Sequence, residues 1–328
     1  MIITLTANPS LDRTVELTGP LSRGSVQRAA SASQQAAGKG VNVSRALAAS
    51  GAESLAVIPG DPEDPVVAGL RQAGLAHLAL PIGQPLRSNI TLTEPDGTTT
   101  KVNEPGPLLN RQQQDRLADA VVAQCSGAAW LVLAGSLPPG VPADFYATLT
   151  AKVRSELGVA APRIAVDTSG EPLRQVYAAS FESAPDLVKP NAEELAELAG
   201  MHSEAELEAS PELAAATAEV LLDRGTEAVL ATLGAKGAVL VTRDGAWSAV
   251  HPPVAARSTV GAGDSSLAGY LLAATRGDAP ADCLRQAVAH GAAAASLPGT
   301  TLPSLEQTKP GSVVVTALAV QLPPAASR

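Results

Sequence analysis

Short apolar runs alternate with longer amphipathic stretches along most of the chain. The apolar runs predict strands buried on both faces, at 2–5, 54–58, 131–134, 164–167 and 228–231. The stretches between them have helical spacing and predict helices, at 65–74, 111–124, 142–157 and 211–224. This alternation predicts an α/β fold with a mostly parallel sheet covered by helices on both faces. In such folds, ligands bind beyond the carboxyl ends of the strands.

Some segments depart from this alternation. Polar residues alternate with apolar ones in four short stretches, at 13–17, 25–30, 87–94 and 98–103. The last two flank a Pro-Asp-Gly turn and predict a β-hairpin. Half-polar strands do not fit between crossover helices, so we expect a second, small β-sheet with parts inserted at about 13–33 and 86–104.

The segment 260–265 (Val-Gly-Ala-Gly-Asp-Ser) places an acid among small residues just before an apolar helical run. We expect Gly261, Ala262 and Gly263 in the first turn of that helix, where free backbone N–H groups and the helix dipole favour an anion. An aspartate would repel an anion that is merely bound. Asp264 fits instead as a base that takes a proton from a hydroxyl attacking a phosphoryl group. The alternative is that Asp264 only interacts favourably with the helix dipole.

A second glycine cluster at 38–45 (Gly-Lys-Gly-Val-Asn-Val-Ser-Arg) leads into a helix that ends near Gly51. It is not a P-loop, because Lys39 is followed by glycine rather than Ser or Thr. It is not a dinucleotide fingerprint either, since Val43 stands where the third glycine would fall. The cluster indicates an anion or sugar site, or else a tight turn with Lys39 in solvent.

Composition limits the function classes. Charged residues make up 17% and hydrophobic residues 45% of the 328 residues, which excludes a disordered chain. A net charge of −9 disfavours a nucleic-acid partner. Cys125 and Cys283 are too few for a disulfide framework and are expected to be buried apolar residues. No charged leader or membrane-length apolar run is present, so we expect a cytoplasmic protein without a membrane partner. No repeat or linker divides the chain, which predicts one domain over 1–328 with a frayed end at 323–328.

Six segments in order carry a family resemblance: 8–12 (Asn-Pro-Ser-Leu-Asp), 38–43, 135–140 (Gly-Ser-Leu-Pro-Pro-Gly), 189–195 (Lys-Pro-Asn-Ala-Glu-Glu-Leu), 232–237 (Thr-Leu-Gly-Ala-Lys-Gly) and 258–264. Over nearly its whole length the chain resembles the ribokinase-like sugar kinases of the phosphofructokinase-B (pfkB) family. The resemblance implies a ribokinase-like three-layer sandwich in which the small β-sheet is a lid over the sugar site. It also implies ATP as phosphoryl donor, Mg²⁺ as its metal and a sugar phosphate as substrate.

Within that family the chain most resembles bacterial 1-phosphofructokinases. This implies phosphorylation of fructose 1-phosphate at C6, giving fructose 1,6-bisphosphate. Tagatose-6-phosphate kinase and 6-phosphofructokinase activities are the alternatives within the family. The segment Arg87-Ser88-Asn89 and the acid at Glu104 depart from the group's more frequent pattern. A homodimer formed through the lid is a further expectation.

The resemblance assigns the residues of the site. Asp264 is expected to act as base, with the amides of Gly261, Ala262 and Gly263 around the transferring group. The substrate-binding residues are expected to be Asp12, Arg28, Gly38, Lys39, Asn42, Arg87, Asn89, Asn103 and Ser136, together with Asp264. ATP is expected at Lys189, Asn191, Thr232, Gly234, Ala235 and Gly237, together with Gly261 and Gly263.

Each assignment has a plainer alternative. Asp12 could cap a turn after Asn8 and Pro9, and the basic residues could be solvated surface charges. Glu194 is expected to hold Mg²⁺ through water, but Glu193 and Glu194 would also suit the first turn of a helix.

Two other classes of protein compete with a kinase. The run 263–267 (Gly-Asp-Ser-Ser-Leu) superficially matches a serine esterase pattern, but it comes late in the chain and lacks a recognisable triad. A catalytically silent sugar-phosphate sensor is disfavoured because Asp264 and the small residues before it are intact. The four histidines share no metal-ligand spacing and are expected to be ordinary residues. His290 alone is a candidate to lie near the adenine.

Overall fold

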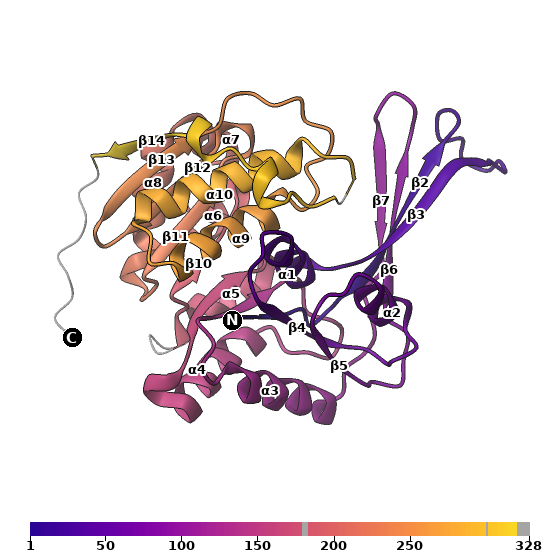
Figure 1. Ribbon diagram of the computed structural model, residues 1–328, viewed down its shortest axis with the longest axis horizontal. Coiled ribbons are helices and arrows are strands. Elements are labelled where there is room, and N and C mark those ends of the chain that lie inside the picture. The colour runs from indigo at the N-terminus through magenta and orange to yellow at the C-terminus, as the bar shows by residue number, and fades with distance from the viewer. Residues whose placement is uncertain (179–182, 300, 320–328) are drawn as a thin grey trace.

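The computed structural model describes residues 1–178, 183–299 and 301–319. It has a large α/β body from which a small four-stranded sheet projects on one side (Figure 1). The predicted frayed end at 323–328 lies outside the described residues. Among the described residues, no helix has both the length and the apolar character needed to cross a bilayer.

Ten strands of the described chain form the main sheet, in the order β14-β13-β12-β11-β10-β9-β8-β1-β4-β5. Neighbours from β11 to β5 are parallel, while β12, β13 and β14 add an antiparallel edge. The strands are β1 (Ile2–Leu5), β4 (Ser54–Pro59), β5 (His77–Leu80), β8 (Trp130–Ala134), β9 (Arg163–Asp167), β10 (Leu187–Val188), β11 (Ala228–Thr232), β12 (Ala238–Thr242), β13 (Gly245–Val250) and β14 (Val314–Leu318). The mostly parallel α/β sheet is therefore confirmed, and all five predicted strands belong to it.

Helices cover both faces of this sheet. They are α1 (Lys39–Ala49), α2 (Pro65–Gln72), α3 (Arg111–Cys125), α4 (Phe145–Leu157), α5 (Gly170–Ala178), α6 (Ala192–Ala199), α7 (Glu204–Ala209), α8 (Pro211–Asp223), α9 (Ala262–Thr275) and α10 (Pro280–Ala295). Three of the four predicted helices match within two residues. The predicted helix at 142–157 begins only at Phe145, because the residues before it form a turn in which Phe145 N donates to Pro142 O.

Alternate residues of each strand face different helices, as the pleat requires. Ile2 packs in a core with residues of α1, α9 and α10, whereas its neighbour Ile3 packs with α3 and α4. Farther along the sheet, Leu230 packs in the same core as Ile2, and Val229 packs with residues of α6 and α8. The sheet and the helices on its two faces thus form three layers, as the family resemblance implies. Cys125 and Cys283 are buried in them as free thiols.

The second sheet, called the lid below, has the order β3-β2-β6-β7. Its strands are β2 (Ser10–Leu17), β3 (Ala29–Ala37), β6 (Arg87–Thr93) and β7 (Thr99–Asn103). The hairpin at 87–103 is confirmed. The predicted strand at 25–30 is wrong, because the strand next to β2 spans Ala29–Ala37. That stretch is rich in Ala, Ser and Gln and has little strand propensity, so its pairing with β2 determines the structure.

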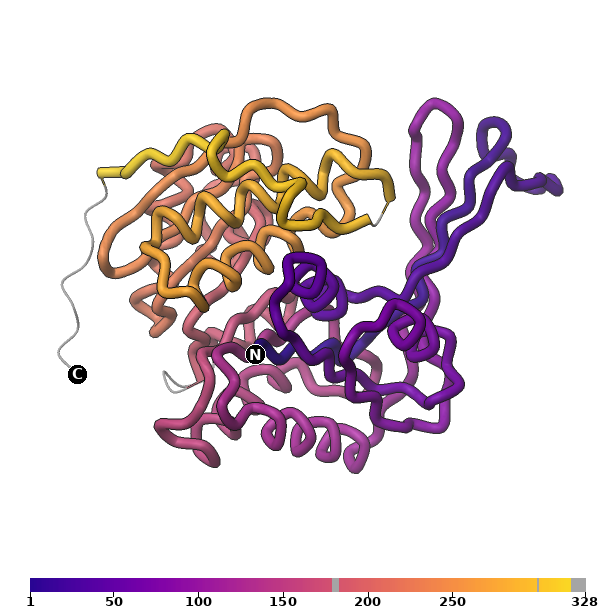
Figure 2. The backbone as a smooth tube through the Cα atoms, viewed as in Figure 1, coloured from indigo at the N-terminus to yellow at the C-terminus, as the bar shows by residue number. Residues whose placement is uncertain are grey.

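The lid is joined to the body at its root, where β2 and β6 run parallel. Their register places Ser10 beside Arg87 and Asp12 beside Asn89. The backbone trace shows the lid strands extending away from the body (Figure 2). Strand β3 ends at Ala37, just before α1, and Asn42 of α1 contacts Asp264 in the first turn of α9. The root of the lid is therefore near the first turns of α1 and α9.

Candidate active site

Helix α9 begins with a buried acid. Its N-cap, Gly261, has φ 76°, a left-handed conformation that favours glycine. Asp264 lies in the first turn and is 7% exposed. A Cβ added at Gly263 would lie 3.3 Å from Nζ of Lys189, so that ammonium group is packed against the same turn. The two glycines thus allow an acid, a cation and the free amides of a helix N-terminus to share one site.

Asp264 is held in a state that accepts protons readily. Burial and the nearby carboxylate of Asp167 raise its pKa to about 6, although Lys39, Asn42 and Lys189 act in the opposite direction. The amide Nδ2 of Asn42 donates to Asp264 Oδ2 at 2.8 Å. Oδ1 of Asn42 is buried and has no hydrogen-bond partner among the described residues. That oxygen is therefore ready to accept a hydrogen bond from a bound hydroxyl.

The glycines at the start of α1 place Lys39 and Asn42. Gly38 has φ 123°, and a Cβ at Gly40 would lie 2.5 Å from Oγ1 of Thr6. Only a residue without a Cβ lets α1 begin this close to the end of β1. The sequence 38–40 therefore fixes where α1 starts and brings Lys39 and Asn42 to the carboxyl ends of the strands.

Asp167 belongs to this cluster but was not predicted as a site residue. It is the last residue of β9 and its side chain is fully buried. Lys39 Nζ lies 2.6 Å from its Oδ1, and Lys189 Nζ lies 3.1 Å from its Oδ2. Burial opposes ionisation of Asp167, yet Lys189 and Lys39 hold its pKa below the usual value. An acid at the carboxyl end of a buried strand is the sequence signal that could have identified it.

Asp12, Arg87 and Asn89 meet at the root of the lid. Asp12 Oδ1 accepts hydrogen bonds from Ser10 Oγ at 2.7 Å and from Asn89 Nδ2 at 2.9 Å. Arg87 donates from Nε to the carbonyl oxygen of Asn8, and burial lowers the pKa of its guanidinium. Because Asp12 lies within β2, it does not cap a turn.

Asn8 joins the lid to the body, a role that the sequence analysis did not assign. Its Nδ2 donates to Pro105 O at 3.0 Å and to Ser136 Oγ at 3.3 Å. Its Oδ1 is buried without a hydrogen-bond partner among the described residues. A Cβ at Gly106 would collide with that oxygen, so the glycine leaves room for Asn8. Ser136, a predicted substrate-binding residue, thus lies beside the root of the lid.

Two further predicted substrate residues on the lid, Arg28 and Asn103, are exposed. Arg28 precedes β3 and is exposed. The β2–β3 register places Ala37 beside Ser10 at the root and Ala29 beside Leu17 at the far end, so Arg28 lies at the far end. The structure therefore does not bring Arg28 to the site, because β3 begins later than predicted. Asn103 is exposed at the end of β7, opposite Asn89.

The predicted nucleotide segments lie next to each other. Asn191 forms a parallel bridge with Thr232 at the end of β11. The chain then makes a short 3₁₀ turn over Gly234–Lys236, which contains Ala235. Gly237 has φ 95°, and a Cβ there would collide with the carbonyl oxygen of Ala249. The loop is thus closely packed on β13 and continues the edge formed by the strand ends.

Glu194, the predicted metal ligand, also caps a helix. Its Oε2 accepts from Asn191 N at 2.9 Å, and Asn191 Oδ1 accepts from Glu194 N at 2.7 Å. This capping box begins α6. The carboxylate also contributes to raising the pKa of Lys39, so it acts on the same cluster. Glu194 therefore stabilises the first turn of α6, as the alternative interpretation expected, and its carboxylate still lies close enough to act on Lys39.

No group of three or more His, Cys, Asp or Glu side chains in the described part of the chain could hold a metal by itself. Mg²⁺ with a nucleotide usually retains several waters and takes one or two carboxylates plus phosphate oxygens. A single carboxylate at Glu194 fits that mode of binding, in which ATP supplies the other ligands.

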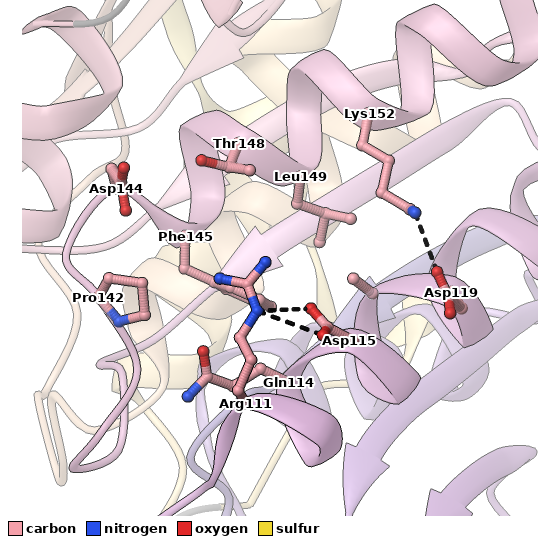
Figure 3. Close-up of a pocket in the computed structure, with 11 residues that line it drawn as sticks. Arg111, Gln114, Asp115, Asp119, Pro142, Asp144, Phe145, Thr148, Leu149 and Lys152 are labelled. Atoms are coloured by element: carbon pink, nitrogen blue, oxygen red, sulfur yellow. Dashed lines mark hydrogen bonds and ion pairs between the residues drawn. The ribbon is translucent and has the colours of Figure 1, made fainter.

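Two other features lie away from the cluster. A cavity of about 590 Å³ lies between α3 and α4 and contains the ion pairs Arg111–Asp115 and Lys152–Asp119 (Figure 3). Those helices cover the sheet face opposite α9. His290 is completely buried between helices, where burial lowers its pKa and Ser50 Oγ lies 3.2 Å from Nε2. Its surroundings are those of a packing residue rather than of a nucleotide contact.

Comparisons with known proteins agree with this geometry. A model described as "pfkB family carbohydrate kinase" matches residues 5–308. A protein from Xanthomonas campestris pv. campestris named 1-phosphofructokinase is 36% identical over 294 residues, covering 88% of each chain. A protein from Mycobacterium tuberculosis named ATP-dependent 6-phosphofructokinase isozyme 2 is 35% identical over 91% of this chain and 85% of its own.

Solved structures show the same fold. The structure of phosphofructokinase-2 from Escherichia coli in complex with substrates and products has a TM-score of 0.83 and 30% identity, covering 93% of this chain and 96% of that one. The family match extends over nearly all of the described body and includes the lid. The chain therefore belongs to the pfkB family of carbohydrate kinases.

Proposed function

We propose that this protein transfers the γ-phosphoryl group of ATP to the C6 hydroxyl of fructose 1-phosphate, giving fructose 1,6-bisphosphate. The observation that carries the reaction type is Asp264, a buried acid with a pKa raised to about 6 beside the amides of a helix N-terminus. The name 1-phosphofructokinase, borne by the Xanthomonas relative at 36% identity, supports the substrate.

The proposed reaction begins with the free hydroxyl of the sugar phosphate at Asp264. The carboxylate takes the hydroxyl proton as the oxygen attacks the γ-phosphorus in line. The amides of Gly261, Ala262 and Gly263 stabilise the negative charge on the transferring oxygens, together with the ammonium group of Lys189. Closure of the lid excludes water and so limits hydrolysis of ATP.

The root of the lid is the proposed sugar site. Asp12 accepts from sugar hydroxyls, and Asn42 can accept through its unpartnered Oδ1. Arg87 faces the phosphate already on the sugar, since a guanidinium can form two parallel hydrogen bonds to it. Asp12 and Arg87 come from the paired strands β2 and β6, and Asn42 comes from α1, where it contacts Asp264.

ATP is proposed to lie along Thr232–Gly237, with its phosphates towards Lys189 and Asn191. Glu194 would hold Mg²⁺ through water, and the metal would neutralise charge on the β- and γ-phosphates. The capping contact uses one carboxylate oxygen of Glu194, Oε2.

A 6-phosphofructokinase activity is the second candidate, because the relative from Mycobacterium tuberculosis bears that name at 35% identity. Tagatose 6-phosphate is the third substrate to test. All three sugars present a primary hydroxyl at one end and a phosphate at the other, so the same base and cations serve each. A sensor without turnover would bind these sugars but release no ADP.

A coupled ADP assay over fructose 1-phosphate, fructose 6-phosphate and tagatose 6-phosphate tests the proposal. We expect the highest kcat/KM for fructose 1-phosphate. A higher value for either of the other sugars would retain the kinase and reject the substrate. Binding of sugar phosphate without ADP release would favour the sensor.

We also propose that two copies pair through the lid. Residues 29–34 of β3 are exposed, and so are Val26 and Val102. Light scattering on the wild type and on Val102→Lys tests this, with a dimer expected only for the wild type.

The cytoplasmic location expected from the sequence remains a prediction that cell fractionation would check.

A further inference from the structure

Two lysines from separate elements meet on one fully buried carboxylate. Lys39 comes from the start of α1, and Lys189 follows β10. Asp167, at the end of β9, lies 2.6 Å from one ammonium nitrogen and 3.1 Å from the other. The side chains of Asp167 and Lys189 are 0% and 4% exposed, whereas that of Lys39 is 35% exposed. Solvent therefore reaches the cluster at Lys39, whereas Asp167 and Lys189 are buried.

We propose that Asp167 is a positioning residue for phosphoryl transfer, which holds the ammonium groups of Lys39 and Lys189 beside the first turn of α9. This inference rests on the proposed kinase function but assigns a residue that the function itself does not require. Each ammonium group has three N–H donors, so contact with one carboxylate leaves donors for phosphoryl oxygens.

A purely stabilising role fits the arrangement poorly. Two ammonium groups share the one carboxylate of Asp167, and a second acid, Asp264, is close enough for its pKa to respond to Asp167. Buried ion pairs are seldom more stabilising than apolar residues of the same size. An ammonium group packed against a helix N-terminus, as Lys189 is, is in contrast suited to a transferring phosphoryl group.

The second effect of Asp167 is on the base. The two carboxylates repel each other, and this repulsion contributes to the raised pKa of Asp264. Asp167 thus acts on the cations and on the base, because it orients the two ammonium groups and contributes to the raised pKa of Asp264.

The test is Asp167→Asn, which retains the shape of the side chain and removes its charge. The matched control is Asp186→Asn, since Asp186 is also ion-paired, to Arg154 at 3.3 Å, and its Oδ2 accepts from Ile164 N near the start of β9. Loss of charge-assisted contacts predicts a fall in kcat of about 10- to 100-fold for Asp167→Asn and little change for the control. The acid limb of the pH–rate profile should also move to lower pH in Asp167→Asn alone, because one of the groups that raises the pKa of Asp264 is gone.

A second measurement does not depend on turnover. Asp167 helps to keep Lys39 protonated, so Asp167→Asn should make Lys39 react faster with an acylating reagent at about pH 9, by about tenfold, as followed by mass spectrometry. Lys152, whose ion pairs to Asp119 and Glu156 are remote from the change, is the internal reference. ATP should protect Lys39 in both proteins.

The outcomes separate the two proposals. Unchanged kcat, pH profile and Lys39 labelling in Asp167→Asn would overturn the positioning role even if the wild type phosphorylates fructose 1-phosphate. A higher Mg²⁺ requirement with unchanged Lys39 labelling would also overturn it, because Asp167 would then act on the metal. Lys39 could label faster in Asp167→Asn while the wild type phosphorylates none of the three sugars. That result would support the positioning of Lys39 by Asp167 and would reject the proposed function.

Discussion

The raised pKa of Asp264 predicts where catalysis fails as the pH falls. The base acts as a carboxylate, so kcat/KM should be full above its pKa and decline below it. With a pKa of about 6, only about a tenth of the molecules carry an ionised Asp264 at about pH 5, against about nine tenths at about pH 7. An unperturbed carboxyl would still be almost fully ionised at about pH 5. We therefore expect a roughly tenfold loss of kcat/KM between these two pH values.

The substrate phosphates complicate this profile, since their second ionisation also lies near pH 6. A variant that changes only the protein group resolves the ambiguity. Asn42→Ala removes the hydrogen bond to Asp264 Oδ2, which helps to lower the pKa of Asp264. Its acid limb should therefore move to higher pH, whatever its effect on the sugar KM.

The assay is a coupled measurement of ADP release from about pH 5 to about pH 8, with coupling enzymes in excess. Activity that stays flat down to about pH 5 would refute the assignment of Asp264 as a base with a raised pKa. Acid limbs that coincide in the wild type and in Asn42→Ala would show that the substrate, not Asp264, titrates.

Three further results are expected. Asp264→Asn should lose about 10²- to 10⁴-fold in kcat while still binding ATP by calorimetry. Because the folded state raises its carboxyl pKa, the ionised acid costs stability above about pH 6, so this variant should have a higher Tm than the wild type there, by an amount that shrinks as the pH falls towards about 4. Arg87→Ala should raise the KM for the sugar phosphate about 10- to 100-fold more than that for ATP, and the reverse would place Arg87 on the nucleotide. Gly269→Ala should lower the free energy of unfolding by about 1–3 kcal/mol in denaturant titrations, because a Cβ there would lie 2.6 Å from Gln286 O. Gly291→Ala, where the nearest atom is at 3.4 Å, is the matched control and should cost less or stabilise α10; equal losses in both would contradict the packing argument.

The hydrophobic pattern predicted the central strands well because both of their faces are buried. It missed β10, which has only two residues, and the hairpin of β12 and β13, whose apolar residues were not assigned to strands. It also misplaced β3, where Ala, Ser and Gln have weak strand propensity and pairing with β2 decides the structure.

The site was predicted less completely, because motifs show residues in sequence order and not in space. The glycine clusters pointed to the start of α9 and to Lys39 and Asn42, and the structure places both residues near Asp264. Asp167 and Asn8 were missed, since each interacts with residues more than ninety positions away. Their roles depend on where the strands end relative to one another, which the periodicity does not reveal.

The parallel pairing of β2 with β6 has a consequence for how the chain folds. These strands are neighbours in the lid, yet the chain between them forms α1, β4, α2 and β5 of the body. Parallel strands need such a crossover, and contacts between residues far apart in sequence form slowly. The lid therefore cannot assemble as an independent unit ahead of the N-terminal part of the body. We expect it to gain its hydrogen-exchange protection only after that part is in place, which makes sugar binding a late acquisition of the folding chain.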